Sequence, residues 1–286
     1  MPLVPFRGAP CTDFNKHVYE TGFTHKLNAS YQIDDDKMVY ATWSTGFRPG
    51  GVNRNASLPP YTSDFLTNYE IGWKTSWVDD ALRFNGAIFR EDWDKVQFST
   101  IPPGSAGLTQ IFNAGSARIW GMESNLDWRV NEALTLSVSG TYTDAYLTKD
   151  YCLDNTPCDP TEIPDAPKGT QLPITSRFKG NALARYEFHW GDYNAHVQGA
   201  AVYNGSEWPA LIASDRATLG KIPDYVTADF SAGIGLNNWS LELYIDNAFD
   251  SHGQTQRFDE CAICNAQVYV TPIEPRLIGL KFAQKY

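Results

Sequence analysis

Hydrophobic and polar residues alternate along much of the chain, as in LTLSVSGTYTDAY at residues 134–146. Leu134, Leu136 and Val138 share one parity there, and the opposite parity is mostly serine and threonine. Because successive side chains of a strand point to opposite faces, this segment predicts a strand with one apolar and one hydroxyl-lined face. In a soluble sandwich the apolar face would be buried. In an outer-membrane barrel it would face lipid, and the polar face would line a wet lumen.

Alternation of this kind recurs and predicts about eleven strands. Their approximate ranges are 17–33, 37–47, 64–77, 81–98, 109–130, 133–147, 173–190, 193–208, 222–236, 239–249 and 275–286. Within 81–98 the apolar parity slips from Ile88 to Phe89, which predicts a β-bulge near Arg90.

The connections between these strands alternate in length. The short ones are Asp34–Asp36, Val78–Asp80, Asn131–Glu132, Gly191–Asp192 and Asn237–Asn238, and the long ones are 48–63, 99–108, 148–172, 209–221 and 250–274. Strict alternation is typical of outer-membrane barrels, which have short periplasmic turns and long extracellular loops. We therefore predict an all-β, antiparallel, up-and-down transmembrane β-barrel.

Four tryptophans lie close to the short turns and share the parity of the apolar residues in their strands. They are Trp77, Trp128, Trp190 and Trp239. Tryptophan gathers at membrane–water interfaces, so these residues predict a lipid-facing girdle at one interface. The alternative is that they mark the edge of a soluble core.

Composition narrows the class of protein further. The mean hydropathy is -0.37, and no apolar run approaches the roughly 20 residues that a membrane helix needs. The net charge is -10 and no basic patch is visible, which argues against a nucleic-acid partner. Nine Trp and fifteen Tyr are typical of membrane interfaces or carbohydrate-binding surfaces. The first residues, MPLVPFRGAP, lack the features of a secretory signal.

The end of the chain carries the most specific local pattern. In PRLIGLKFAQKY, Ile278, Leu280, Phe282 and the terminal Tyr286 share one parity. This resembles the C-terminal signature by which outer-membrane barrels are recognised for assembly, with Phe282 and Tyr286 as its aromatic positions, although Gln284 departs from it.

Further stretches resemble, in order, the C-terminal half of a TonB-dependent outer-membrane receptor barrel. They are YATWSTGFRPGGVN at 40–53, YEIGWKTSWVDDALRFNGAIF at 69–89, NAGSARIWGMESNLDW at 113–128, LTLSVSGTYTDA at 134–145, IPDYVTADFSAGIGLNNWSLELYIDNAFD at 222–250 and PRLIGLKF at 275–282. The resemblance implies a receptor in the Gram-negative outer membrane that imports a scarce ligand such as a ferric siderophore, cobalamin or a glycan.

Receptors of this family are 22-stranded barrels with an N-terminal plug, and they are energised by the TonB complex. About eleven strands and no plug imply a partial, open barrel at 17–286, preceded by an extracellular loop remnant at 1–16. The expected partners are outer-membrane lipid, the barrel assembly machinery and a siderophore or other small ligand. The TonB complex would be reached only through an N-terminal region that is missing here. No cofactor is expected.

Candidate ligand contacts are the polar and aromatic residues at the ends of the long loops. They are Arg48, Asn53, Arg54, Tyr61, Trp208, His252, Arg257 and Phe258. Arginine suits an anionic siderophore, whereas aromatic rings with asparagine would equally suit a sugar. Alternatively, they are solvated loop residues without a ligand role. The alternative function is therefore a secreted or surface all-β glycan-binding module.

Other chemistry is not indicated. The histidines are scattered, and Asp34–Asp36 fits an acidic turn better than a calcium site, so no metal site is predicted. No catalytic set is visible, which predicts a protein that is not an enzyme.

The cysteines fall in the long loops. Cys152 and Cys158 share one loop, Cys261 and Cys264 share another, and Cys11 is left without a neighbour. Extracellular loops are in oxidising surroundings, so we predict two local disulfides. Free thiols or a zinc site are the alternatives.

Overall fold

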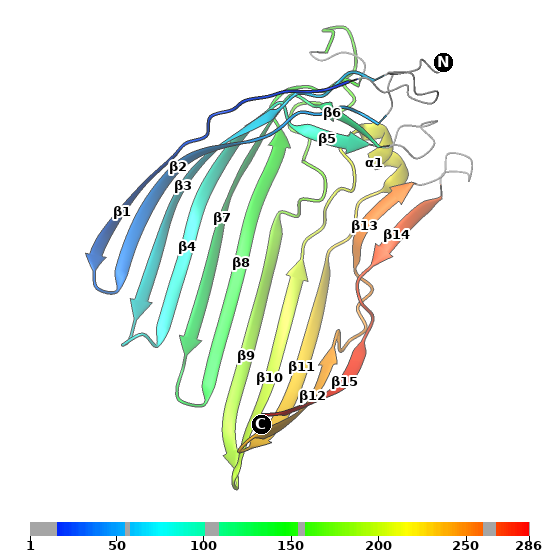
Figure 1. The fold of residues 1–286 in the computed structure, drawn as a ribbon. Helices are drawn as coiled ribbons and strands as arrows, with labels where there is room; N and C mark the ends of the chain where they lie inside the picture. The colour runs from blue at the N-terminus through cyan, green and yellow to red at the C-terminus, as the bar shows by residue number, and fades with distance from the viewer. Residues whose placement is uncertain (1–15, 55–57, 101–108, 154–157, 260–266, 286) are drawn as a thin grey trace, which may run out of the picture.

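The computed structural model describes residues 16–54, 58–100, 109–153, 158–259 and 267–285. These residues form one eleven-stranded antiparallel sheet, two short hairpins and one helix (Figure 1). The strands of the sheet, in spatial order, are β1 (Lys26–Asp34), β2 (Lys37–Arg48), β3 (Asp64–Trp77), β4 (Leu82–Asp94), β7 (Ser116–Arg129), β8 (Leu134–Leu147), β9 (Phe178–Trp190), β10 (Tyr193–Asn204), β11 (Tyr225–Leu236), β12 (Trp239–Asp246) and β15 (Leu277–Gln284). The predicted all-β, antiparallel, up-and-down architecture is confirmed.

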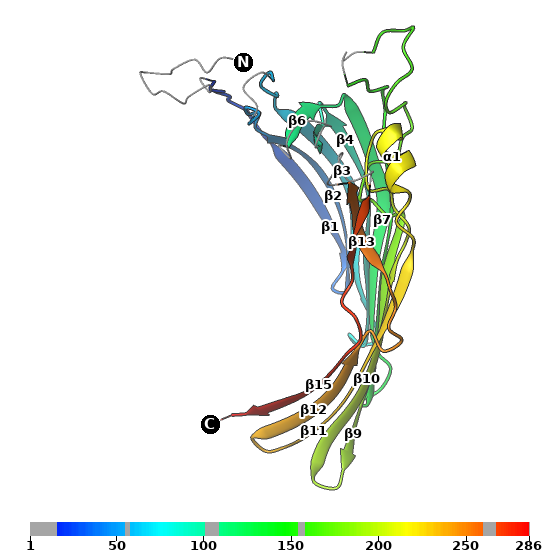
Figure 2. The same ribbon diagram turned by 90° about the vertical axis from the view of Figure 1, so that its right-hand side faces the viewer.

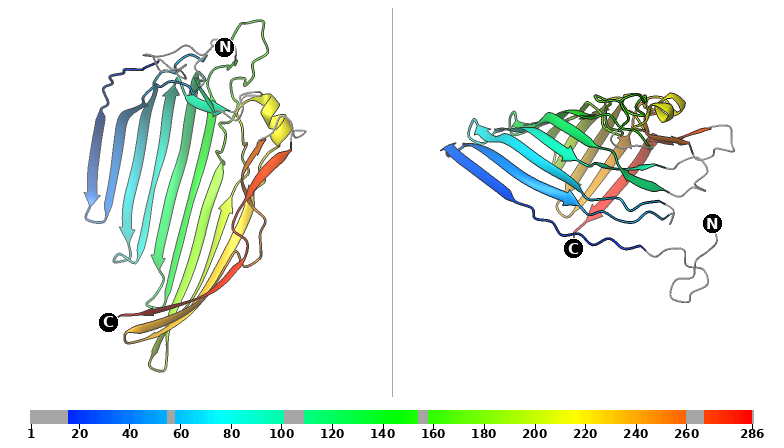
Figure 3. Two further views of the ribbon diagram at one scale, coloured as in Figure 1. Left: turned by 45° about the vertical axis from the view of Figure 1, so that its right-hand side comes forward. Right: turned by 90° about the horizontal axis from the view of Figure 1, so that it is seen from above.

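The sheet is strongly curved and open. Figures 2 and 3 show β1 at one edge and β15 at the other, and these two strands do not pair with each other. All the short turns of the sheet lie at one end and the long connections at the other (Figure 1). The loop alternation in the sequence predicted this arrangement.

Each face of the sheet has its own chemistry. Val138 pairs with Leu126 on one side and Ala182 on the other, whereas the neighbouring Ser137 pairs with Asp127. When this pairing is followed through all the strands of the sheet, one face is mostly apolar and the other is mostly polar. Side chains of the polar set, including Asp229 and Lys281, border a hollow on the concave side, so the apolar residues occupy the convex side.

Aromatic residues ring the convex face at two levels. Near the short turns, Trp77, Trp128 and Trp190 are exposed, and Trp239 packs edge-on to Tyr193. Nearer the long loops, Tyr142 contacts both Trp120 and Phe178. Trp120 and Trp128 are eight residues apart on β7. At about 3.4 Å per residue this is ~27 Å along the strand, or about 20 Å of height at a tilt of about 40°, which is most of the roughly 25 Å of a membrane-facing band.

The predicted bulge near Arg90 is wrong. β4 pairs with β3 and β7 from Leu82 to Asp94 without any shift in register. Arg90 stays on the convex face and pairs with Asp92 at 2.8 Å, and Asp92 also accepts a hydrogen bond from Arg118 at 2.7 Å. The apolar parity breaks off in the sequence because the convex face becomes charged beyond the apolar band.

Several boundaries differ from the prediction. The first strand begins at Lys26, and the predicted strands 81–98 and 109–130 each lose a short piece to a hairpin of β5 (Gln97–Thr100) and β6 (Gln110–Asn113). Lys95 and Gly115 have φ of 56° and 69°, and this left-handed backbone bends the hairpin across the end of the sheet. The predicted loops 209–221 and 250–274 contain the helix α1 (Ala213–Leu219) and the hairpin of β13 (Gln254–Asp259) and β14 (Val268–Pro272).

The main buried cluster lies at the long-loop end, not along the sheet. Its members come from the ends of β7 and β8 and from the loops around them: Val96, Ala114, Ala117, Ala145, Leu147, Tyr151, Ala166, Leu172 and Leu211. Phe112 of β6 stacks on Tyr151 with ring centroids 5.1 Å apart. The hairpin β5–β6, loop 148–172 and the segment leading into α1 are therefore joined into one packed cap. None of the helical residues that the structure describes belongs to a helix long and apolar enough to cross a membrane.

Candidate functional site

The rim is the long-loop end of the sheet together with its packed cap. Six of the eight predicted ligand contacts fall into two groups there. We call the first the β5–β6 side, which comprises Arg48, Asn53, Arg54, Tyr61, Asp64 and Gln97. We call the second the α1 side, which comprises Glu207, Trp208, Arg216, Lys221 and Arg257.

On the β5–β6 side, Arg48 is held by a buried carboxylate. Asp64 is only 2% exposed, and it accepts hydrogen bonds from the Arg48 backbone N at 3.2 Å, from Nε at 2.9 Å and from Nη2. Asp64 also accepts from the Gln97 backbone N at 3.2 Å, and Arg48 Nη2 donates to the Gln97 carbonyl at 3.1 Å. The guanidinium lies over the Trp93 ring at 5.0 Å. Arg48 thus fastens β2 and β3 to the start of β5.

Asn53 and Tyr61 also hold the loop. Asn53 is buried; its Nδ2 donates to the Pro59 and Ile111 carbonyls at 3.0 and 2.9 Å, and its Oδ1 accepts from the Ile111 backbone N at 2.7 Å. Tyr61 pairs with Gly51 in an isolated bridge, and its ring covers that glycine. Arg54 is exposed. Most polar groups on this side are therefore satisfied by the fold.

Glu20, in the segment that precedes β1, also binds to the β5–β6 side. Its carboxylate accepts hydrogen bonds from the Gly50 backbone N at 2.6 Å and the Ser63 backbone N at 3.1 Å. Hydrogen bonding from the Ser63 side chain, followed by that from the Gly50 backbone, lowers the pKa of Glu20 below its ordinary value.

On the α1 side, two cations lie near one indole ring. Arg216 is 5.0 Å and Lys221 is 6.0 Å from the centroid of Trp208. The Arg216 guanidinium donates to the Ala210 carbonyl at 2.9 Å and to the Gln171 carbonyl, and burial lowers its pKa.

Arg257 lies at the end of the same helix. Its Nη1 donates to the Leu219 carbonyl at 3.1 Å and its Nε to Gln254 Oε1 at 2.7 Å. Among the described residues, no carboxylate forms an ion pair with Arg216, Lys221 or Arg257. These three cations therefore differ from Arg48, which is held by a carboxylate.

Glu207 lies next to Trp208 and is 9% exposed. Its backbone pairs with Ile222, which fixes the position of Lys221, but its Oε2 atom has no hydrogen-bond partner in the described part of the chain. Burial raises the pKa of Glu207, and the positive charge of Lys179 opposes this rise.

The remaining predicted residues take no part in either network. His252 is exposed, and Phe258 stacks on Tyr269 across β13 and β14 with centroids 5.9 Å apart. The prediction missed Arg216 and Lys221 because 209–221 was read as a loop, and it missed Glu207 because that residue fell within the predicted strand 193–208. The glycine that follows ASDRATL is a helix-ending signal that could have revealed α1, since Gly220 ends it with φ of 68°.

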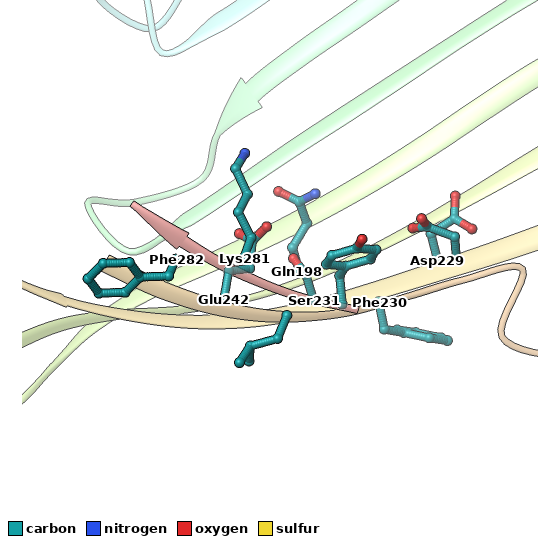
Figure 4. A pocket seen from close by; sticks show the side chains of 10 residues that line it. Gln198, Asp229, Phe230, Ser231, Glu242, Lys281 and Phe282 are labelled. Carbon is teal, nitrogen blue, oxygen red and sulfur yellow. The ribbon is translucent and has the colours of Figure 1, made fainter. Parts of the chain in front are cut away.

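The concave wall carries a separate hollow of about 710 Å³ on β10, β11, β12 and β15. In Figure 4, Gln198, Asp229 and Lys281 project from the side of the strands opposite to Phe230. Glu242, on the same wall, contacts His196 Nε2 at 3.0 Å. The hollow is an open stretch of the polar face.

The cysteines are only partly described. A disulfide bond joins Cys152 to Cys158, with Cα atoms 5.3 Å apart. Cys11, Cys261 and Cys264 lie outside the described residues, as do Tyr286 and most of the predicted loop remnant. Within the described residues, no group of three or more His, Cys, Asp or Glu side chains could hold a metal ion.

An open, curved sheet with an apolar convex face and a polar concave face defines the wall of an outer-membrane β-barrel. Residues 6–248 match the family model described as the TonB dependent receptor-like beta-barrel. This match covers most of the chain, so the chain belongs to the TonB-dependent receptor-like β-barrel family.

Individual relatives agree with this family. The probable TonB-dependent siderophore receptor PiuA of Acinetobacter baumannii is 23% identical over 280 residues, which are 92% of this chain and 34% of that protein. The pesticin receptor of Yersinia enterocolitica is 26% identical over 254 residues, covering 85% of this chain and 33% of the receptor. These relatives are receptors, which agrees with the prediction that the chain is not an enzyme.

Solved structures show the same fold. The ferric yersiniabactin uptake receptor FyuA from Yersinia pestis superposes with a TM-score of 0.72 at 19% identity, covering 91% of this chain and 37% of that chain. The siderophore receptor PiuA from Acinetobacter baumannii gives a TM-score of 0.71 at 23% identity, covering 92% of this chain and 36% of that chain. The chain spans about a third of the length of the curated relatives it matches.

Proposed function

We propose that this chain is part of the barrel wall of a Gram-negative outer-membrane receptor that takes up a ferric siderophore. The observation that carries the proposal is the division of the sheet into an apolar convex face and a polar concave face, in a chain of the TonB-dependent receptor family. The names of the relatives support the choice of ligand, since PiuA is named a siderophore receptor and FyuA a ferric yersiniabactin uptake receptor.

The alternative, a secreted glycan-binding module, is less well supported. A soluble module must bury its apolar face, but Leu280 is 65% exposed and Ile71 is 66% exposed on the convex side. A continuous apolar band of this kind suits lipid. Outer-membrane lipid and the barrel assembly machinery therefore remain the proposed partners, with Phe282 on the convex face as part of the assembly signal.

The direction of the edge strands limits how the barrel could close. Eleven strands in up-and-down order leave β1 and β15 running in the same direction. If a second copy of this chain completed the barrel around a common axis, β15 of one copy would lie parallel to β1 of the other. Every strand pair within this sheet is antiparallel. We propose that an odd number of further strands, belonging to the rest of the receptor, joins β15 to β1.

Growth under iron limitation tests the proposal. In a strain without its own receptor, we expect a receptor containing this wall, with plug and TonB box, to restore TonB-dependent growth on a ferric siderophore. This chain alone, exported with a signal peptide, should not restore growth, because its described residues form an open wall rather than a closed barrel. Rescue by the chain alone would contradict the partial-barrel proposal, and failure of the complete receptor on every siderophore would contradict the uptake function.

A further inference from the structure

A group of charged side chains lies on the convex face of the sheet, at the end nearest the long loops. We call it the arginine cluster, and it comprises Arg90, Asp92, Arg118, Asp144 and Arg177. A convex side chain of a barrel wall faces lipid, where charge is costly. The cluster therefore needs an explanation other than solvent exposure.

The cluster lies at the level of the upper aromatic residues. In the register of the sheet, Arg90 is opposite Tyr69 on β3 and Trp120 on β7, and the next convex position on β4 toward the short turns is Ile88. Tyrosine and tryptophan gather at membrane–water interfaces. On a wall whose convex face is in lipid, the guanidinium groups thus lie at the depth of the lipid headgroups, on the extracellular side.

The cluster is confined to one part of the wall. The convex side chains of β9, β10, β11 and β12, all of which the structure describes, include no Asp, Glu, Lys or Arg. If charge merely marked the end of the apolar band, it would recur around the whole wall. Its restriction to the neighbourhood of β4, β7 and β8 indicates a local role.

Asp92 holds two guanidinium groups next to each other. Its carboxylate accepts hydrogen bonds from Arg90 Nη2 at 2.8 Å and from Arg118 Nε at 2.7 Å. Two positive charges and one negative charge leave these three side chains with a surplus of one positive charge. The Arg90 and Arg118 side chains are 50% and 35% exposed, so N–H groups of both remain accessible from the lipid side.

The two other carboxylates in this part of the convex face have their own partners. Asp144 pairs with Arg177 at 3.2 Å, and Asp94, at the end of β4, accepts a hydrogen bond from Ser116 Oγ at 2.7 Å. Neither forms an ion pair with Arg90 or Arg118 among the described residues. The surplus positive charge is therefore available to an external anion.

We infer that Arg90 and Arg118 bind a phosphate group in the headgroup of an outer-leaflet lipid. A guanidinium group donates paired hydrogen bonds to phosphate oxygens, and two adjacent guanidinium groups can share one phosphate. The acyl chains of the lipid then lie over Ile88 and its apolar neighbours, with Trp120 at the headgroup. The inference rests on the proposed placement of the convex face in the outer membrane, and it concerns a site that faces away from the lumen.

Binding of one lipid with and without its phosphates tests this inference. The assembled receptor containing this wall, in detergent micelles, is titrated with a diphosphorylated glucosamine lipid (lipid A), with the same lipid after removal of its phosphates, and with sodium phosphate. Native mass spectrometry measures the bound lipid. We expect lipid A to bind about tenfold more tightly than the dephosphorylated lipid, and an equal concentration of sodium phosphate not to displace it. Equal binding of the two lipids would overturn the inference, and so would displacement by phosphate, which would indicate a site for the free anion.

Substitutions then locate the site. Arg90→Gln should weaken binding of lipid A about threefold to tenfold, as for the loss of one charge-assisted contact, and leave the dephosphorylated lipid unchanged. Arg83→Gln is the matched control, since it removes an exposed arginine from the concave side of the same strand. Arg118→Gln replaces Arg90→Gln if the latter does not assemble into a compact barrel on gels.

Equal effects of Arg90→Gln and Arg83→Gln on lipid A binding would overturn the inference. Growth on a ferric siderophore, measured on the same variants, separates the two proposals. We expect Arg90→Gln to retain that growth, because its side chain faces lipid. A receptor that supports growth but binds the two lipids equally would contradict the lipid site alone, whereas a receptor that binds lipid A but never supports growth would contradict the uptake function alone.

Discussion

The two sides of the rim use arginine differently. Arg48 on the β5–β6 side is neutralised by a carboxylate that is 2% exposed, and the same carboxylate holds the start of β5. Among the described residues, Arg216 on the α1 side donates to two backbone carbonyls and forms no ion pair. Residue type alone therefore does not identify a ligand contact at such a rim. What distinguishes the two sides is whether the fold already supplies the counter-charge.

The largest expected effect is the loss of Asp64. Asp64→Ala removes the counter-charge of the Arg48 guanidinium and the hydrogen-bond acceptor of the Gln97 backbone N. We expect the β5–β6 side to be destabilised by about 3 kcal/mol, at the lower end for a broken buried pair because Arg48 is half exposed. Hydrogen exchange at the Gln97 and Arg48 amides measures this. Asp35→Ala in an exposed turn is the control, and equal protection in both variants would show that Asp64 does not fasten this side.

A smaller loss is expected from filling space at Gly50. A Cβ there would overlap the Tyr61 carbonyl and lie 2.7 Å from Glu20 Oε1. Gly50→Ala should cost about 1–3 kcal/mol by overpacking, whereas Gly46→Ala, where a Cβ meets open space inside β2, should be neutral or stabilise by up to about 1 kcal/mol. The temperature at which the barrel loses its compact form on gels reports the difference. Similar shifts for the two variants would contradict the close packing of loop 48–63.

The disulfides of the long loops offer a third test. Peptide mapping without reductant, on exported material, should recover Cys152 linked to Cys158 and Cys261 linked to Cys264. Replacing Cys152 and Cys158 by serine should loosen loop 148–172 by about 2 kcal/mol, as expected for a short loop of sequence separation 6. Alkylation of all four thiols without reductant would reject the disulfides, and zinc retained after dialysis would favour a metal site.

The smallest effect concerns Glu207 and depends on pH. Since burial raises its pKa above the ordinary 4.5, the folded chain binds this proton more tightly than the unfolded chain. The stability of the α1 side should be greatest below pH 4.5 and should fall as the pH rises through the raised value. Glu207→Gln should abolish this loss. Hydrogen exchange of the Glu207 and Ile222 amides across this pH range measures the loss of stability as a fall in their opening free energies. If the variant kept the same pH dependence, the loss would belong to another titrating group.

Much of the sheet could be predicted from the sequence, because a strand with lipid on one side and water on the other must alternate with period two. The short turns were also readable, since Asn, Asp and Gly mark them in the sequence. The charged part of the convex face beyond the apolar band could not be predicted, because Arg90 and Asp92 interrupt the apolar parity without any break in the strand.

The rim was harder to predict for a different reason. Arg48 and Arg257 are both arginines at the ends of long loops, and only the tertiary structure places Asp64 beside one of them. The hairpin β5–β6 depends on backbone bends at Lys95 and Gly115, of which only the glycine is a recognisable signal. On the α1 side, the backbone bridge between Glu207 and Ile222 brings Trp208 and Lys221 together from the two ends of α1.

The central claim is that the apolar convex face lies in lipid and the concave face lines the lumen. Val138, 50% exposed on the convex face, and its neighbour Ser139 on the concave face test it directly. With native cysteines replaced by serine, a spin label at each position would be examined in outer membranes containing the assembled receptor. We predict that the label at Val138 is relaxed by oxygen dissolved in lipid and the label at Ser139 by a water-soluble nickel chelate. Relaxation of both labels by the nickel chelate would contradict the claim.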